Sequence, residues 1–343
     1  MTGDCPAGLT DGDTILVFHL RQVGDLVFSL PLLQACRQAL PGSTIISVLA
    51  RELHPLLRAS PFVDEILTRY GDPMVSLARQ VRRRRPAVAL GLSQSTATGL
   101  LMLASGARRR VGFADSDLQW ALSEVVPLQG TPNPAKMAAI GAALGLTVPH
   151  PSYQGLLALP DDARRRAAAL LEAAGVPPSG AILMGIGVSE RRSFKAWPTE
   201  RFAEVAKQLA REAPVVLVGN ETERPTAERL AAENAGTFSI AGRTPLDVLA
   251  GVMAGARFYI GSDSGPLHLA AAMGTPVVAL YGPTDPACTG PHGQGHIILN
   301  RELDCAPCQR GCESRRCMAG ITVEEVLAAA ATLLRGGERL VPA

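Results

Sequence analysis

The sequence has few aromatic residues, little net charge and no long apolar run. Phe, Trp and Tyr make up only 4% of the 343 residues, so the interior must be built mainly from Leu, Val, Ile and Ala. The formal net charge is +2, which is too small to suggest a nucleic-acid-binding protein. No apolar stretch reaches the roughly 18 residues of a membrane-spanning helix, so none is expected.

Two common sequence signals are also missing. Residues 1–13 contain Asp4, Asp11 and Asp13 but no basic residue, unlike a signal peptide, and the expected location is therefore the cytoplasm. No GxGxxG motif follows the first predicted strand, and Gly185-Ile186-Gly187 is only a fragment of one. The dinucleotide-binding fingerprint of a Rossmann enzyme is thus absent from its usual place.

What is present is a regular alternation of strands and helices. Strands are expected at 14–20, 43–49, 87–92, 181–185, 214–218, 258–261 and 276–280. Helices are expected at 26–39, 161–174 (capped by Asp161 or Asp162), 199–212, 226–235, 267–273 and 323–334. Such alternation predicts an α/β fold with parallel sheets covered by helices.

The proline-rich residues 149–160 are interpreted as a linker between two domains, 1–158 and 159–343. Each domain is predicted to be doubly wound and Rossmann-like, with a cleft between the two. Ligands of such sheets bind beyond the carboxyl ends of the strands. The functional residues are therefore expected in the turns that follow strands.

The turn after the first strand contains Gly24 and Asp25 within the segment LRQVGDLVFSL. One interpretation is that Asp25 is an N-terminal helix residue stabilised by the helix dipole. The other is that Asp25 is a general base that accepts a proton from an attacking hydroxyl group. The local pattern leaves both open.

The segment 258–290, FYIGSDSGPLHLAAAMGTPVVALYGPTDPACTG, is the most informative. Asp263 and Ser264 are helix-capping residue types, Gly265 allows close backbone approach, and His268 lies in the same helical turn. A helix N-terminus of this kind favours a bound phosphate. A second turn, 282–286, follows the next strand, and two such turns can enclose one nucleotide. Ordinary capping is the alternative.

Four segments resemble the ADP-heptose:lipopolysaccharide heptosyltransferase family, glycosyltransferase family nine. They are ILVFHLRQVGDLVFSLPLLQACRQALP, KAWPTERFAEVAKQL, DSGPLHLAAAMGTPVVALYGPTDP and CAPCQRGCESRRCMAGITVEEV, in the order in which the family has them. The resemblance is thin between residues 52 and 158. It implies a GT-B fold, with two facing Rossmann-like domains, and an inverting transferase that does not depend on a metal. The N-terminal domain would bind the acceptor and the C-terminal domain the nucleotide sugar, and the last helix is a candidate to pack back on the first domain.

The resemblance also implies roles for individual residues. Asp25 matches the aspartate that activates the acceptor, and Lys195 matches a lysine that contacts the donor diphosphate, so both are predicted to be catalytic. The predicted donor-binding residues are Ser189, Glu223, Asp263, Ser264, Gly265 and His268. Either Glu221 or Glu223 would contact the ribose, and local spacing favours Glu223.

The chemistry agrees with these assignments. Inverting transfer needs a carboxylate base for the hydroxyl nucleophile and a cation for the departing diphosphate. Many transferases hold a metal with a DxD pair, but Asp263-Ser264-Gly265 lacks the second carboxylate. Lys195 and the helix N-terminus can serve instead. A lysine that is merely salt-bridged or solvated is the alternative.

The implied substrates are an ADP-sugar donor and a lipopolysaccharide core or lipid A acceptor, with transfer of heptose or a related sugar and peripheral contact with the inner membrane. No nucleic acid partner and no required cofactor are implied. Two other functions stay open: a related nucleotide-sugar enzyme such as an epimerase, and a non-catalytic nucleotide-sugar binding module. An epimerase would need further acid and base residues, and Asp25 with Lys195 argues against a simple binder.

Two further features have alternative explanations. Cys305, Cys308, Cys312 and Cys317 have spacings suited to structural zinc or an iron–sulfur cluster, although buried thiols without a metal would satisfy the same pattern. The basic runs 82–85 and 108–110 suit a solvated helix face or a docking face for a phosphorylated lipid.

Overall fold

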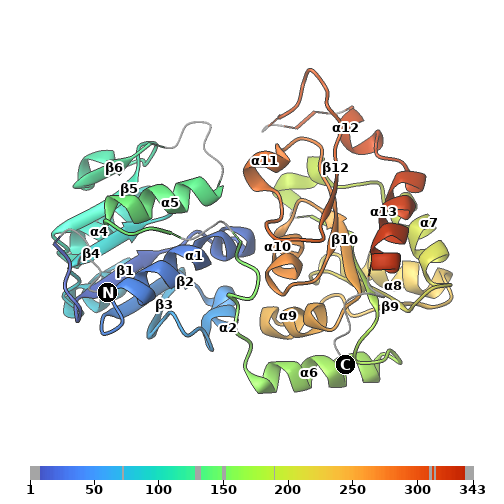
Figure 1. Ribbon diagram of the computed structural model, residues 1–343, viewed down its shortest axis with the longest axis horizontal. Helices are drawn as coiled ribbons and strands as arrows, with labels where there is room; N and C mark the ends of the chain where they lie inside the picture. Colours follow the sequence, from blue (N-terminus) through green and yellow to red (C-terminus); the bar gives the residue numbers. More distant parts are fainter. Residues whose placement is uncertain are drawn as a thin grey trace. The chain divides into compact units, whose positions relative to one another are not determined.

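The chain forms two compact units, Met1–Ala158 and Leu159–Ala343, each built around one six-stranded sheet (Figure 1). The structure is a computed structural model. It describes residues 8–71, 73–127, 133–148, 152–188, 190–308, 311–312 and 314–336. Ser189 and residues 149–151 of the expected linker lie outside these ranges.

The first unit has a parallel sheet in the order β3-β2-β1-β4-β5-β6. Its strands are β1 (Thr14–Phe18), β2 (Thr44–Ala50), β3 (Glu65–Arg69), β4 (Val88–Gly91), β5 (Arg109–Phe113) and β6 (Glu124–Val126). Its helices are α1 (Val23–Ala39), α2 (His54–Leu57), α3 (Met74–Arg83), α4 (Thr96–Ser105) and α5 (Asn133–Ala143), with short 3-10 helices η1 (Arg51–Leu53) and η2 (Gln119–Ala121).

The second unit has a parallel sheet in the order β12-β11-β10-β7-β8-β9. Its strands are β7 (Ile182–Gly185), β8 (Val215–Val218), β9 (Thr237–Ser239), β10 (Phe258–Ser262), β11 (Val277–Leu280) and β12 (Ile297–Leu299). Its helices are α6 (Asp161–Ala173), α7 (Thr199–Leu209), α8 (Arg224–Glu233), α9 (Leu246–Ala254), α10 (Gly265–Ala272), α11 (Pro286–Thr289), α12 (Arg316–Ala319) and α13 (Val323–Gly336), with 3-10 helix η3 (Glu190–Lys195).

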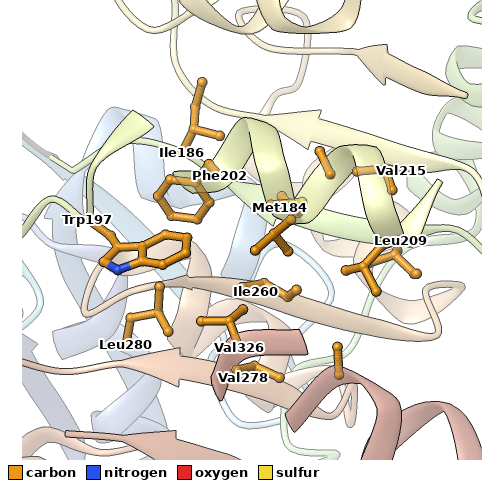
Figure 2. Packing of buried hydrophobic residues seen from close by; sticks show 14 of the residues in the cluster. Met184, Ile186, Trp197, Phe202, Leu209, Val215, Ile260, Val278, Leu280 and Val326 are labelled. Carbon is orange, nitrogen blue, oxygen red and sulfur yellow. The ribbon is translucent and has the colours of Figure 1, made fainter. Parts of the chain in front are cut away.

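The central strands are apolar on both faces because helices cover both. In the second unit, alternate residues of β7, β8, β10 and β11 face α7, α8 and α13, where the rings of Trp197 and Phe202 pack edge to face in the core (Figure 2). The intervening residues of these strands point to the opposite face of the sheet. Continuous apolar strands of this kind are typical of a parallel sheet inside an α/β layer structure.

The two sheets have the same connectivity. Each follows the doubly wound order in which the first strand of the unit lies next to the fourth, so the chain changes direction between β1 and β4 in one unit and between β7 and β10 in the other. Ligands of doubly wound sheets bind beyond the carboxyl ends of the strands at this switch point. The turns after β1, β7 and β10 are therefore the places to look for functional residues.

Expected and observed elements agree in type but differ at their ends. Helix α1 begins three residues before the expected residue 26, and it continues through Pro31 without interruption. Neither Asp161 nor Asp162 caps α6: the N-cap is Pro160, and both aspartates lie in the first turn. Strands β3, β5, β6, β9 and β12 were not expected. Within the described ranges, no helix has the length and apolar character needed to cross a membrane.

Candidate active site

Asp25 lies at the switch point of the first unit, in the first turn of α1. The N-cap residue Gln22 has extended backbone dihedral angles and makes no side-chain capping bond, so the turn is not closed by a capping side chain. The Asp25 side chain is half-buried. The helix dipole favours a carboxylate at this position, which is compatible with both interpretations of the role of Asp25.

His19 follows β1 directly and is a buried neutral histidine that the sequence analysis did not single out. Its Nε2 lies 3.1 Å from Ser47 Oγ and its Nδ1 lies 3.3 Å from Ser29 Oγ. The Ser29 hydroxyl donates to the Leu26 carbonyl at 2.7 Å, so the Nδ1–H of His19 donates to Ser29. Burial, with a smaller contribution from the charge of Arg69, lowers the pKa of His19 to about 3.

Arg69, the last residue of β3, is a second polar residue that was missed. It is only 3% exposed, and its guanidinium donates to the His19 carbonyl at 3.3 Å and to Ser95 Oγ at 2.9 Å. It also stacks 4.9 Å from the centre of the Tyr70 ring. Burial lowers its pKa below the ordinary arginine value, but an arginine remains charged at neutral pH. The carboxyl edge of the first sheet thus carries one buried positive charge.

The second unit brings together Lys195 and Asp263, which follow the two strands of its switch point. Lys195 Nζ lies 2.5 Å from Asp263 Oδ2. The Lys195 and Asp263 side chains are only 5% and 7% exposed, so the ion pair is little screened by solvent. Because a buried charge needs a partner, each of the two residues holds the other in place.

Asp263 has two further partners. Thr284 Oγ1 donates to the same carboxylate oxygen, Oδ2, at 2.6 Å, and His268 Nε2 lies 3.4 Å from the other, Oδ1. Burial alone would raise the pKa of Asp263, but hydrogen bonding and charge attraction from His268, together with Lys195, outweigh it and hold this pKa well below its usual range. Both carboxylate oxygens are therefore engaged by side-chain donors.

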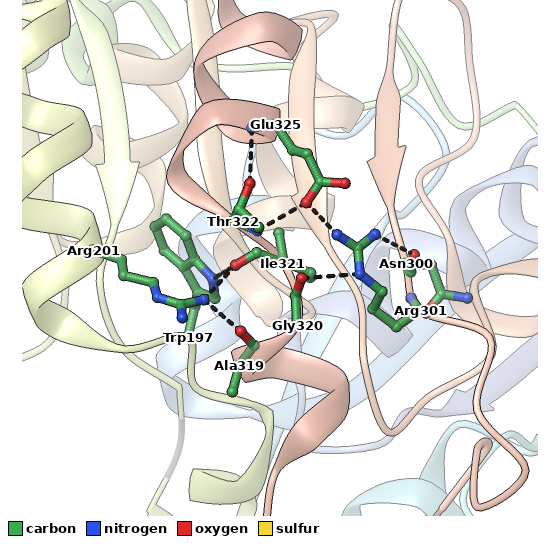
Figure 3. A network of polar contacts seen from close by, with 9 residues as sticks. All are labelled: Trp197, Arg201, Asn300, Arg301, Ala319, Gly320, Ile321, Thr322 and Glu325. Carbon is green, nitrogen blue, oxygen red and sulfur yellow. Dashed lines mark hydrogen bonds and ion pairs between the residues drawn. The ribbon is translucent and has the colours of Figure 1, made fainter.

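The loop that presents Lys195 is anchored from behind. Trp197 is 1% exposed, and its Nε1–H donates to the Ile321 carbonyl at 3.0 Å. Arg201 donates to the carbonyls of Ala319 and Ile321 at 2.6 and 2.5 Å. Figure 3 shows these bonds continuing through Arg301 and Glu325 at the start of α13. The C-terminal helices thus fix the backbone on which Lys195 is mounted.

The two candidate ribose ligands differ clearly. Glu223 Oε2 accepts the Asn220 N–H at 2.8 Å, and its Oε1 lies against Gly187, where an added Cβ would clash with it. Burial raises the pKa of Glu223. Glu221 is 71% exposed at its side chain and pairs with Arg224 at 3.2 Å. Only Glu223 lies against the turn after β7.

The N-terminus of α10 lies beside the ion pair. Helix α10 begins at Gly265, and its N-cap Ser264 makes no side-chain capping bond. Pro266 occupies the first turn, where its missing N–H does no harm. Gly265 is half-buried, so its backbone is partly accessible to a ligand. Of the remaining predicted donor-binding residues, Ser189 lies outside the described residues.

The four clustered cysteines line one small cavity together with Phe194 and Pro283. All four are free thiols. Within the parts of the chain that the structure describes, no group of three or more His, Cys, Asp or Glu side chains is placed to hold a metal ion, so the structure lends the structural-zinc prediction no support. Instead the cysteine loop packs behind the site: the Cys308 N–H donates to the Pro283 carbonyl at 2.6 Å.

Several arginines of the two basic runs bind to other groups of the first unit. Arg84 pairs with Glu65, and Arg109 pairs with Glu124 at 2.8 Å. Arg110 donates to backbone carbonyls of Ala107 and Ala121. These three arginines therefore have structural roles, while Arg83, Arg85 and Arg108 are exposed.

A sequence profile described as glycosyltransferase family 9 (heptosyltransferase) matches residues 74–318. The chain belongs to glycosyltransferase family 9. The predictions of the family and of an α/β fold of the GT-B type, with two Rossmann-like units, are confirmed.

Relatives of this family 9 member are named lipopolysaccharide heptosyltransferases. Lipopolysaccharide heptosyltransferase 1 of Pseudomonas aeruginosa is 39% identical over 118 residues, 33% of this chain and 32% of that relative's length. Lipopolysaccharide heptosyltransferase 3 of Escherichia coli is 24% identical over 291 residues, 78% of this chain and 81% of its own. The first of these matches therefore spans about a third of the relative, and the second spans most of it.

Solved structures agree on the fold. The structure of ADP-heptose lipopolysaccharide heptosyltransferase II from Escherichia coli has a TM-score of 0.79 and 25% identity, covering 95% of this chain and 99% of that one. A UDP-GlcNAc 2-epimerase from Methanocaldococcus jannaschii is more distant, with a TM-score of 0.52 and 10% identity, covering 94% of this chain and 92% of that one.

Proposed function

We propose that this family 9 member is an inverting glycosyltransferase that transfers a heptose, or a related sugar, from an ADP-sugar to the inner core of lipopolysaccharide. The observation that carries the proposal is the buried Lys195–Asp263 pair beside the N-terminus of α10. It provides positive charge and backbone N–H donors at the switch point of the second sheet. The names of the relatives support the choice of donor and acceptor.

The donor diphosphate would bind at this cluster in the second unit. A lysine ammonium has three donors, so the bond from Lys195 to Asp263 is compatible with a second contact to a phosphate oxygen. The N–H groups at the start of α10 add partial positive charge. Asp263 and His268 would act indirectly: Asp263 fixes Lys195, and His268 fixes Asp263. The sequence predicted that His268 binds the donor, whereas here it would act through Asp263.

Glu223 would bind the ribose of the nucleotide. Its carboxylate lies at the end of β7 next to Gly187, and one of its oxygens is already oriented by the Asn220 N–H. Two ribose hydroxyls can donate to one carboxylate, which is why an acidic residue is suited to this role. Glu221 is directed away into an ion pair with Arg224.

The acceptor would bind to the first unit, where Asp25 is the proposed base. The acceptor oxygen attacks the anomeric carbon while the bond from that carbon to the diphosphate oxygen breaks, so the configuration inverts. Asp25 takes the acceptor proton, and ADP leaves with the electron pair and the additional negative charge. Lys195 and the α10 N–H groups stabilise that charge. Arg69 gives the first unit a positive charge suited to an anionic acceptor.

Peripheral contact with the membrane would use exposed arginines of the first unit. Arg83, Arg85 and Arg108 have exposed side chains, whereas three neighbours in the two basic runs are held inside the fold. Each such residue near an anionic surface contributes about 1 kcal/mol. Binding to vesicles with and without anionic lipid tests this part of the proposal.

The deciding experiment is acceptor-dependent release of ADP. The protein is incubated with ADP-heptose and a heptose-acceptor core oligosaccharide, and ADP and the anomeric configuration of the product are measured. ADP release only with the acceptor, and inversion of configuration, are expected. Sugar interconversion without an acceptor would indicate an epimerase, and binding without turnover would indicate a binding module. Either result contradicts the proposal.

A further inference from the structure

Tyr259 occupies a slot formed by two glycines at the switch point of the second sheet. Gly185 and Gly261 are register partners at the ends of β7 and β10. A Cβ atom at either position would collide with the Tyr259 hydroxyl. The ring therefore runs along the sheet toward the carboxyl ends of the strands, and both glycines are needed to accommodate it. Tyr259 is 0% exposed.

The hydroxyl at the end of this ring lies near the Ser264 hydroxyl, but the two do not meet at ordinary hydrogen-bond geometry. Among the described residues, the Tyr259 Oη and the Ser264 Oγ are both buried atoms without a hydrogen-bond partner. A buried hydroxyl that lacks a hydrogen-bond partner lowers the stability of the folded protein. Phenylalanine would fill the same slot without that cost. A tyrosine here is therefore explained if its hydroxyl gains a partner in another state of the site.

Glu223 and Ser264 are the neighbours that give this hydroxyl a function. Burial raises the pKa of Tyr259, the negative charge of Glu223 raises it further, and the nearby Ser264 hydroxyl opposes the rise. Glu223 Oε1 lies against Gly187, two residues beyond the end of β7. Ser264 is the N-cap residue of α10, but its side chain makes no capping bond to that helix. Two hydroxyls and one carboxylate thus gather at the end of β7.

We propose that Tyr259 is a positioning residue for nucleotide binding. When the ribose binds to Glu223, the Tyr259 and Ser264 hydroxyls hydrogen-bond to the Glu223 carboxylate and fix its orientation toward the ribose diol. Tyr259 itself does not touch the nucleotide, because its side chain is fully buried. The inference deepens the proposed function and rests on the assignment of Glu223 as the ribose ligand.

The test compares ADP with 2′-deoxy-ADP in Tyr259→Phe. Calorimetry on the full chain should show about tenfold weaker ADP binding for the variant, because a hydrogen bond to the charged carboxylate is lost. Loss of the 2′-hydroxyl should weaken binding to the wild type about tenfold and to the variant by less than about threefold. The KM for the donor should rise with little change in kcat. The melting temperature without nucleotide should stay the same or rise.

Tyr281→Phe is the matched control. The Tyr281 hydroxyl donates to the Thr289 carbonyl at 2.7 Å, so this variant should lose stability and keep the wild-type ratio of ADP to 2′-deoxy-ADP affinity. Ser264→Ala provides a second variant and should reduce the ratio in the same direction as Tyr259→Phe.

An unchanged ratio in Tyr259→Phe overturns the inference, and so does a fall in melting temperature with equal weakening of both nucleotides. Failure of the proposed function looks different. In that case the wild type itself fails to discriminate ADP from 2′-deoxy-ADP, or does not bind ADP.

Discussion

The carboxyl edges of the two sheets have the same topology but different electrostatics. In the second unit, Lys195, Asp263, His268 and Thr284 form one connected cluster in which a single carboxylate receives all the other groups. In the first unit, the corresponding edge has a neutral buried histidine and a buried arginine held by a carbonyl and a hydroxyl. In the second edge the lysine is paired with a carboxylate, whereas in the first edge the buried arginine is bonded to a carbonyl and a hydroxyl.

This difference indicates how each edge is suited to its proposed substrate. The second edge is oriented before any ligand binds, because Asp263 fixes the position of Lys195 and the loop behind it is anchored to the C-terminal helices. Such preorganisation suits the stabilisation of charge that develops on a leaving group. In the first edge, the proposed roles fall to Asp25 for chemistry and to Arg69 for charge.

The largest expected effect is at Asp25, the proposed base of the first edge. Asp25→Asn should lower kcat by a factor of roughly 10² to 10⁴, because proton transfer in the transition state is lost. ADP affinity should not change, since the nucleotide is proposed to bind at the second edge. Steady-state kinetics and calorimetry measure the two quantities. The control is Asp115→Asn, which changes an exposed carboxylate of the same unit. Near-normal turnover of Asp25→Asn would show that Asp25 only stabilises the start of its helix.

A smaller effect is expected at Lys195. Lys195→Ala should weaken ADP binding by about 1.5–3 kcal/mol, as for a charge-assisted hydrogen bond, and adenosine binding much less. The variant should also melt at a lower temperature. Removing one partner leaves the other buried and unpaired, which lowers the free energy of unfolding by roughly 3–5 kcal/mol.

Two comparisons make the Lys195 result interpretable. Lys195→Gln keeps a donor for Asp263 and separates the loss of binding from the loss of folding. Lys207→Ala removes an exposed lysine of α7 and should change neither quantity. Equal weakening of ADP and adenosine by Lys195→Ala would show that Lys195 does not act on the phosphates.

The contrast between the edges also explains what could be predicted from the sequence. Glycine, proline and small helix-capping residues mark the turn after β10, so Asp263, Gly265 and His268 could be found from local pattern. Strands β1, β2, β4, β7, β8, β10 and β11 are short apolar runs and were equally evident. Strands β3 and β5 escaped prediction because arginine and threonine interrupt their apolar pattern.

Residues whose role depends on distant partners could not be predicted. Arg69 lies in a mixed strand, and only the folded chain shows that it meets His19 and Ser95, residues from two other strand ends. Thr284 was seen only as a turn residue, although it bonds to Asp263 across 21 positions. The spacing of the cysteines suited either a metal site or buried thiols without a metal, and only the folded chain shows their loop against Pro283 and Phe194.

A third prediction concerns the loss of stability at acid pH that the buried His19 of the first edge should cause. In the unfolded chain a histidine has a pKa near 6.5, whereas burial lowers that of folded His19 to about 3. Below pH ~6.5 the unfolded state therefore binds a proton that the folded state does not, and stability falls as the pH falls toward 3. The slope contributed by this one group approaches ~1.4 kcal/mol per pH unit.

Urea unfolding of His19→Gln and of the wild type between pH 4 and 6.5 measures this slope. The variant should show a shallower fall of unfolding free energy with decreasing pH, whatever its stability at neutral pH. Asp263 acts in the same direction but in a lower pH window: its lowered pKa contributes stability that is lost as the pH falls below the ordinary aspartate range. An identical slope in the two proteins would mean that His19 is protonated in the fold.

The smallest expected effect is that of a chelator. Treatment with EDTA should leave the transfer rate unchanged, because both oxygens of Asp263 are engaged by Lys195, Thr284 and His268 and the DxD position lacks a second carboxylate. The charge of the leaving diphosphate then falls to Lys195 and the N–H groups of α10. The rate is measured before chelation, after it, and after addition of Mg²⁺ or Zn²⁺. A loss that Mg²⁺ restores would place a metal on the diphosphate and remove the proposed role of Lys195. A loss that only Zn²⁺ restores would instead point to the four thiols behind Pro283, and the second edge would then depend on a metal for its shape while keeping Lys195 for its charge.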